Sequence, residues 1–144
     1  MHPTETQYLL ARSSKDYKLL HDLVESETGK PDTTAYSYPT VFAIRNGEII
    51  GFFATHQNDR AVIAGPLVIK GGRNPFVAMR LAESYDTVMR MNGIKFYYCS
   101  VDAKRTDVFG KGRIESLGLT YWETVDGIAW YKRHLQVIPT LQAA

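Results

Sequence analysis

The stretch 70–75, with the sequence KGGRNP, combines residue types that hold anions in proteins. Two glycines and two basic side chains, Lys70 and Arg73, lead into Asn74 and Pro75, which are residues that helix starts prefer. The first backbone N–H groups of a helix have no partner within it, and the helix dipole places partial positive charge there. The pattern therefore predicts an anion site with phosphate as its natural ligand. A plain turn with a good helix cap is the alternative interpretation.

One side chain departs from the usual composition of such a loop. Phe76 stands at a position where a backbone that approaches a phosphate closely would favour glycine. A side chain there is compatible with binding only if it points away from the ligand. The sequence alone leaves open whether the loop still binds an anion.

Length and composition place this loop in one globular domain, residues 1–144. Of the 144 residues, 44% are hydrophobic and 22% are charged, which is ordinary for a chain that buries a core. The net charge of +2 argues against bulk binding of nucleic acid. No apolar run has the roughly 20 residues of a membrane helix. His2, His21 and His134 lack metal-ligand spacing with a cysteine or carboxylate. The single cysteine, Cys99, excludes an internal disulfide and fits a cytoplasmic protein without a secretory signal.

Hydrophobic periodicity and turn signals predict alternating strands and helices. Asn46-Gly47 and Asp126-Gly127 are strong signals for hairpin turns, and residues 30–39 are expected to form a loop or a short irregular helix. The elements expected in chain order are a strand (7–12), a helix (15–27), a hairpin (40–55), a strand (61–69), a helix (75–92), a strand (94–101), a short helix (106–117) and a hairpin (119–135). This order predicts an α/β domain with a mixed, mainly antiparallel central sheet of about six or seven strands and about three or four helices.

The strand AVIAGPLVI, residues 61–69, contains a proline, which cannot donate to a strand ladder. We expect a bulge at Gly65-Pro66 that moves the second half of the strand, Leu67 to Ile69, away from one neighbouring strand. The backbone groups of that half would then be open to a ligand in a cleft. Ligands of such sheets bind near the carboxyl ends of strands where the strand order opens, and loop 70–75 is expected there.

This order of elements resembles the fold of the GCN5-related N-acetyltransferases, the acyl-CoA N-acyltransferase fold, over residues 7–135. The resemblance rests on the hairpin FAIRNGEIIGFFAT, the interrupted strand AVIAGPLVI, the segment RNPFVA in place of the family's R/Q-x-x-G-x-G/A loop, and RIESLGL before the last hairpin. It implies direct transfer of an acetyl group from acetyl-CoA to an amine. It further implies that Leu67, Val68 and Ile69 contact the pantetheine arm, and that the diphosphate is held by Arg73, Asn74, Pro75, Phe76, Val77 and Ala78.

The resemblance assigns no general base. The bulged strand carries no acid, and Ile114 stands where family members often have a tyrosine. Since the amine must lose a proton, the candidates are His56, Asp102 and Tyr97, each with an ordinary structural role as its alternative. The basic candidates for outlying phosphates are Lys70, Arg73, Lys104, Arg105 and Lys111.

Two functions stay open. The first is an acetyltransferase whose acceptor, a small-molecule or protein amine, enters over loop 33–38 and the last hairpin. The second keeps the fold without the reaction, as a binding or assembly module such as a phage structural or host-directed protein, with a second copy or another component as partner. A third reading, modification of a nucleic-acid base, is disfavoured by the near-neutral charge.

Overall fold

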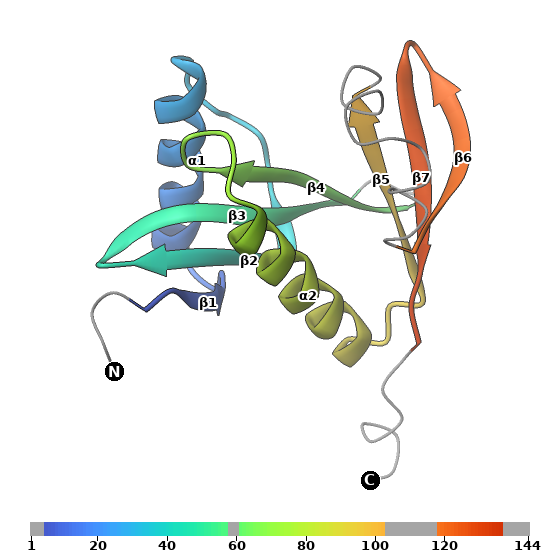
Figure 1. Ribbon diagram of the computed structural model, residues 1–144, viewed down its shortest axis with the longest axis horizontal. Coiled ribbons are helices and arrows are strands. Elements are labelled where there is room, and N and C mark those ends of the chain that lie inside the picture. The colour runs from blue at the N-terminus through green and yellow to red at the C-terminus, as the bar shows by residue number, and fades with distance from the viewer. Residues whose placement is uncertain (1–4, 58–60, 103–117, 137–144) are drawn as a thin grey trace, which may run out of the picture.

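The computed structural model describes residues 5–57, 61–102 and 118–136. It has two helices and seven strands over these ranges (Figure 1). The elements are β1 (Gln7–Leu10), α1 (Ser14–Thr28), β2 (Ser37–Arg45), β3 (Glu48–Gln57), β4 (Val62–Ile69), α2 (Pro75–Met91), β5 (Phe96–Asp102), β6 (Leu119–Val125) and β7 (Ile128–His134). The two helices are two of the three or four expected from the sequence. The short helix expected at 106–117 lies outside the described residues, as do Lys104, Arg105, Lys111 and Ile114.

The strands form one sheet in the order β1-β2-β3-β4-β5-β7-β6. Every neighbouring pair is antiparallel except β4 and β5, which are parallel and are connected through α2. The prediction of a mixed, mainly antiparallel sheet is confirmed, with seven strands.

The helices begin and end where their capping residues predict. Ser13 caps α1 and forms a reciprocal capping box with Asp16, while Gly29 ends the helix with φ 75°. Asn74 caps α2 by accepting a hydrogen bond from the Val77 N–H at 3.3 Å, with Pro75 at the first helical position.

The two helices cover opposite faces of the sheet (Figure 1). Side chains of a strand alternate between the faces, so Phe42 packs in the cluster under α1 while its neighbours Val41 and Ala43 pack in the cluster under α2. The α2 cluster is centred on Leu81, Tyr85 and Met89, which are fully buried. None of the described helices is long and apolar enough to cross a membrane.

Both hairpins form as predicted, and one loop is shorter than predicted. Asn46-Gly47 and Asp126-Gly127 each have positive φ at both positions, as a type I′ turn requires. Residues 37–39, expected to be part of a loop, belong to β2. The strand tolerates Pro39 because its register with β3 shifts between Ser37 and Val41, which spares a ladder hydrogen bond there.

Candidate functional site

Strands β4 and β5 pair over only two rungs and then part. Ile63 lies opposite Tyr98 and Ala64 opposite Cys99, and the pairing of the two strands ends there. Figure 1 shows β4 and β5 running in different directions from this short contact. We call the place where they separate, directly after Ala64 and Cys99, the β4–β5 split.

A bulge on β4 coincides with the split. Against β3, Thr55 is opposite Ala64 whereas Phe53 is opposite Leu67, so β4 carries one extra residue between these rungs. Gly65 lies within the bulge with φ 131°, a conformation that side-chain-bearing residues rarely adopt. The predicted bulge at Gly65-Pro66 and the divergence of the second half of β4 are therefore confirmed.

The ladder with β3 determines which backbone groups of β4 face the split. The Lys70 N–H donates to the Ile50 carbonyl at 2.9 Å, which makes this the hydrogen-bonded type of pair. Because such pairs alternate along antiparallel strands, Val68 directs its backbone groups to β3, while Leu67 and Ile69 direct theirs away from it. The N–H groups of Leu67 and Ile69 are thus the donors aimed to the β5 side of β4.

The chain after β4 turns tightly into α2. Gly71 and Gly72 both adopt left-handed conformations, with φ 78° and 81°, and the Gly72 N–H donates to the Ile69 carbonyl at 2.8 Å. Asn74 accepts from the N–H of Val77 through its side chain and from that of Ala78 through its carbonyl. Among the described residues, nothing accepts from the Phe76 N–H, which points out of the helix start and is free for an anion.

The aromatic ring of Phe76 is 78% exposed to solvent. It therefore does not fill the space beside β4, and it leaves the helix start accessible. Arg73 is exposed as well. The loop combines a free backbone donor, the α2 dipole and a basic side chain, which together favour an anion.

Two carboxylates from other elements lie on this loop. The Glu27 Oε1 atom accepts a hydrogen bond from the Gly71 N–H at 2.7 Å, and Glu48 pairs with the Lys70 ammonium. Sequence reasoning missed both contacts, because they join positions 44 and 22 residues apart. The Lys70 charge is thus already compensated, and the loop backbone holds one anionic oxygen.

His56, a candidate base, lies one strand from the split. It is half-buried near the end of β3, opposite Ile63, and meets the Tyr36 ring edge-on with 5.7 Å between ring centroids. Asp102 is the last residue of β5, opposite Ile128.

Tyr97, another candidate base, has a structural role instead. Its buried hydroxyl donates to Asp86 of α2 at 2.7 Å, and Asp86 also pairs with the Arg133 guanidinium at 2.9 Å. Burial, and then the negative charge of Asp86, raise the pKa of Tyr97 far above its ordinary value. The phenol therefore stays protonated at neutral pH and links α2 to β5.

Cys99 sits beside this pair on the last paired rung. The thiol is half-buried, and burial raises the pKa of Cys99 to about 12. It is a thiol rather than a thiolate at neutral pH, as expected for a small packing residue.

A polar cluster next to His56 was not anticipated. Asp32 accepts hydrogen bonds from the Thr34 N–H and hydroxyl and from the Tyr36 hydroxyl, and pairs with His21 at 3.2 Å. The His21 ring stacks on Tyr36 at 5.2 Å. Burial alone would raise the pKa of Asp32, but the hydrogen bonds from Tyr36 and Thr34 outweigh it and lower that pKa. The Asp-x-Thr spacing, typical of an Asx turn, was the one local signal for this cluster.

The strand order, the parallel pair that parts after a bulge and the helix start at its end define the fold of the GCN5-related N-acetyltransferases. Many solved structures share this fold. The ribosomal-protein-S18-alanine N-acetyltransferase from Escherichia coli superposes with a TM-score of 0.71 at 13% identity, over 93% of this chain and 96% of that one. An acyl-CoA N-acyltransferase from Pseudomonas aeruginosa superposes with a TM-score of 0.69 at 13% identity, over 90% of this chain and 99% of that one. The yncA protein from Salmonella typhimurium was solved with its cofactor acetyl-CoA. It superposes with a TM-score of 0.66 at 11% identity, over 96% of this chain and 99% of that one.

No protein-family model and no curated protein matches the sequence. At these identities the similarity to solved structures shows the fold alone. Any catalytic activity depends on the residues at the split.

Proposed function

We propose that the protein is an acetyl-CoA-dependent N-acyltransferase that transfers an acetyl group to an amine by direct attack. The observation that carries this proposal is the parting of β4 from β5 after Ala64, followed at once by a helix start that favours an anion. A slender thioester with a phosphate-rich end needs these two features side by side.

The cofactor would lie with its diphosphate at the start of α2 and its pantetheine arm along β4. Arg73, the Phe76 N–H and the α2 dipole would hold the diphosphate. The outward N–H groups of Leu67 and Ile69 would bond to the arm and polarise the thioester carbonyl as its oxygen gains charge.

In the reaction the amine nitrogen attacks the thioester carbonyl carbon. An N–C bond forms, the C–S bond breaks, and the products are an amide and coenzyme A, with the thiolate taking up a proton. His56 would accept the proton of the attacking amine through an intervening water, since it lies one strand from the split on β3.

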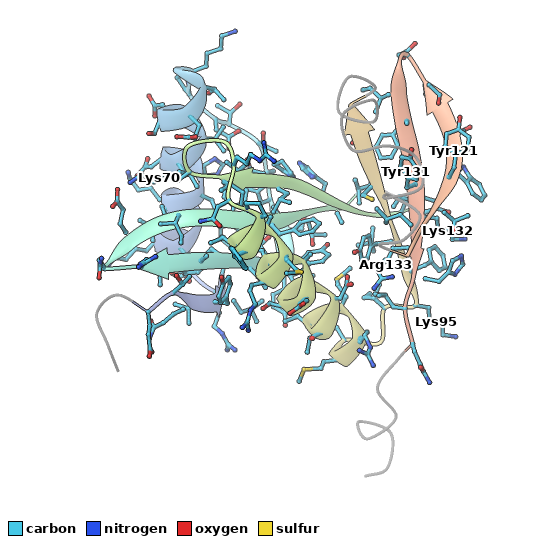
Figure 2. The ribbon with its side chains drawn as sticks, viewed as in Figure 1. Lys70, Lys95, Tyr121, Tyr131, Lys132 and Arg133 are labelled. Carbon is cyan, nitrogen blue, oxygen red and sulfur yellow. The ribbon has the colours of Figure 1, made fainter. Side chains whose placement is uncertain are left out.

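Calorimetric titration with acetyl-CoA tests the cofactor assignment. We expect binding in the micromolar range, and an Arg73→Ala variant should weaken it about tenfold. Lys95→Ala is the matched control, because this exposed lysine lies far from Lys70 and the α2 start in the fold (Figure 2). Release of free thiol that depends on an added amine then tests the reaction.

A second candidate function is a binding or assembly module that uses the fold without catalysis. It is favoured by Phe76 in place of a glycine and by Glu27 and Glu48, whose negative charges sit where a diphosphate would approach. An absence of heat with acetyl-CoA at roughly millimolar concentration would support this candidate and overturn the transferase.

A further inference from the structure

The face of the sheet that carries α1 continues beyond the split without cover from either described helix. Phe52 and Ala54 of β3 pack under α1, so His56, two residues on, points to the same face. Residues directly opposite each other on neighbouring strands share a face. His56 lies opposite Ile63, Ile63 opposite Tyr98, Tyr98 opposite Lys132, and Lys132 opposite Thr120, so all of them lie on this face. His56 and Lys132 therefore flank the last paired rungs of β4 and β5 on one side of the sheet.

Lys132 is held on this face by aromatic rings. Its Nζ atom lies 4.2 Å from the ring centroid of Phe96, 5.4 Å from that of Trp122 and 5.7 Å from that of Tyr98. The rings of Tyr98 and Trp122 also meet each other edge-on at 5.9 Å. The ammonium thus has a defined position rather than the freedom of a surface lysine.

Within the described part of the chain, no carboxylate pairs with Lys132. Its neighbour on β7, Arg133, points to the opposite face and is neutralised by Asp86 (Figure 2). Phe96 and Trp122 are 42% and 55% exposed, so a ligand can reach the rings and the ammonium between them. An unpaired cation on an accessible aromatic platform is complementary to an anion attached to an apolar or planar group.

The distance from this cation to the reacting position limits the shape of the ligand. The ammonium lies nearest Phe96, and the split begins after Cys99, three residues further along β5. Three residues of strand span about 10 Å. We propose that the acyl acceptor is an elongated amine with an anionic group about 10 Å from its reactive nitrogen, bound by Lys132 against Phe96 and Trp122.

This inference rests on the proposed transferase activity and specifies its acceptor. A peptide with a free α-amine and an acidic third residue has the required length, since an extended chain rises about 3.3 Å per residue. In the tripeptide amides Ala-Ala-Glu and Ala-Ala-Gln the third side chains have nearly the same shape and differ in charge, while Ala-Ala-Lys reverses the charge. A phosphoserine in the third position distinguishes a phosphate from a carboxylate as the preferred anion.

The test measures amine-dependent thiol release from acetyl-CoA by the full chain with each peptide. We expect kcat/KM for the Glu peptide to exceed that for the Gln peptide at least about fivefold, and the Lys peptide to be the poorest. Lys132→Gln should bring the Glu-to-Gln ratio to about one, and Lys132→Arg should retain the preference. Lys15→Gln, a control with the same charge change at the exposed start of α1, should leave the ratio as in the wild type.

Peptide binding by calorimetry without acetyl-CoA separates this inference from the transferase activity. Turnover that is indifferent to the third residue, or a preference that survives in Lys132→Gln, overturns the acceptor assignment and leaves the transferase standing. Binding of the Glu peptide that depends on Lys132, with no turnover of any peptide, supports the anion site and overturns its role in binding an acceptor. The titration with acetyl-CoA then decides separately whether the transferase stands. If no peptide binds and none is turned over, the acceptor assignment is refuted, and the transferase is refuted with it only if acetyl-CoA does not bind either.

Discussion

The carboxylate of Glu27, in the last turn of α1, accepts a hydrogen bond from the backbone N–H of Gly71 at 2.7 Å. The contact joins the end of α1 to the loop that leads into α2, on the side of the molecule where a diphosphate would bind (Figure 1). An acid in this position has two opposite effects. It orders the loop, and it repels any second anion nearby.

We predict that Glu27→Gln tightens acetyl-CoA binding severalfold at low ionic strength. The amide oxygen of glutamine still accepts from the Gly71 N–H, so the loop stays ordered while one negative charge is removed. The gain should shrink as salt screens the interaction. Calorimetry at two salt concentrations measures both effects.

Glu25→Gln is the matched control, because Glu25 is exposed on the same helix and its side chain forms no hydrogen bond or ion pair with another described residue. Equal gains in the two variants would indicate a general charge effect. Weaker binding in Glu27→Gln would mean that the carboxylate is needed to shape the loop.

We predict that Phe76→Ala changes the affinity for acetyl-CoA by less than about threefold. The ring is in solvent, whereas the backbone N–H that would meet the diphosphate is kept in the variant. Unfolding should also be little affected, since surface substitutions away from special contacts usually cost less than about 0.5 kcal/mol. A tenfold change in the dissociation constant would place the ring in contact with the ligand.

Local rules predicted the parts of this site that depend on neighbours in sequence. The proline of Gly65-Pro66 cannot join a ladder, so the bulge and the split beside it followed from one residue type. The helix start at Asn74 and Pro75 followed from an equally local rule.

The features that the sequence left open depend on how distant segments meet. The direction of the Phe76 ring is fixed by the rotation of α2, which Leu81 and Tyr85 set by packing on the sheet. The packing of α2 on the sheet also brings Asp86 within hydrogen-bond distance of Tyr97 and of Arg133. No local sequence pattern carries this information. For the same reason the sequence did not predict the hydrogen bond from Gly71 to Glu27 or the pairing of His21 with Asp32.

We predict that Tyr97→Phe lowers stability by about 1 kcal/mol but leaves the pH profile of acetyl transfer unchanged. The phenol is a hydrogen-bond donor to Asp86 and not a base, and Arg133 continues to satisfy that carboxylate in the variant. Denaturant unfolding measures the loss. A changed pH profile would restore Tyr97 as a candidate base.

The stability of the protein at alkaline pH also tests whether Tyr97 is a hydrogen-bond donor in the folded state. The pKa of Tyr97 is raised above its ordinary value of 10.0, so its stabilising contribution is complete below pH 10 and is lost as pH rises through the folded-state value. The stability difference between wild type and Tyr97→Phe should therefore narrow above pH 10.

We predict that Asp32→Asn costs roughly 1.5–3 kcal/mol at pH 7, because it weakens charge-assisted hydrogen bonds to a side chain that is only 7% exposed. The pKa of Asp32 is lowered in the folded protein, so this contribution is present above its ordinary value of 3.8 and is lost as pH falls through the folded-state value. Unfolding measured at pH 7 and pH 3 should show a smaller difference between wild type and variant at the lower pH. A difference independent of pH would mean that the Asp32 charge is not what orders residues 30–36.

The proton acceptor is the least constrained part of the mechanism, and His56 is the residue to change. We predict that His56→Gln lowers the rate of acetyl transfer about a hundredfold or more at saturating acetyl-CoA. The affinity for acetyl-CoA should be unaffected, because His56 pairs with Ile63, ahead of the half of β4 that would bind the cofactor, and its ring meets Tyr36. Glutamine keeps a polar side chain at the end of β3, and equal melting temperatures would show that the fold is intact. Full turnover in this variant would leave water as the proton acceptor and reduce the catalytic machinery to the backbone donors of β4.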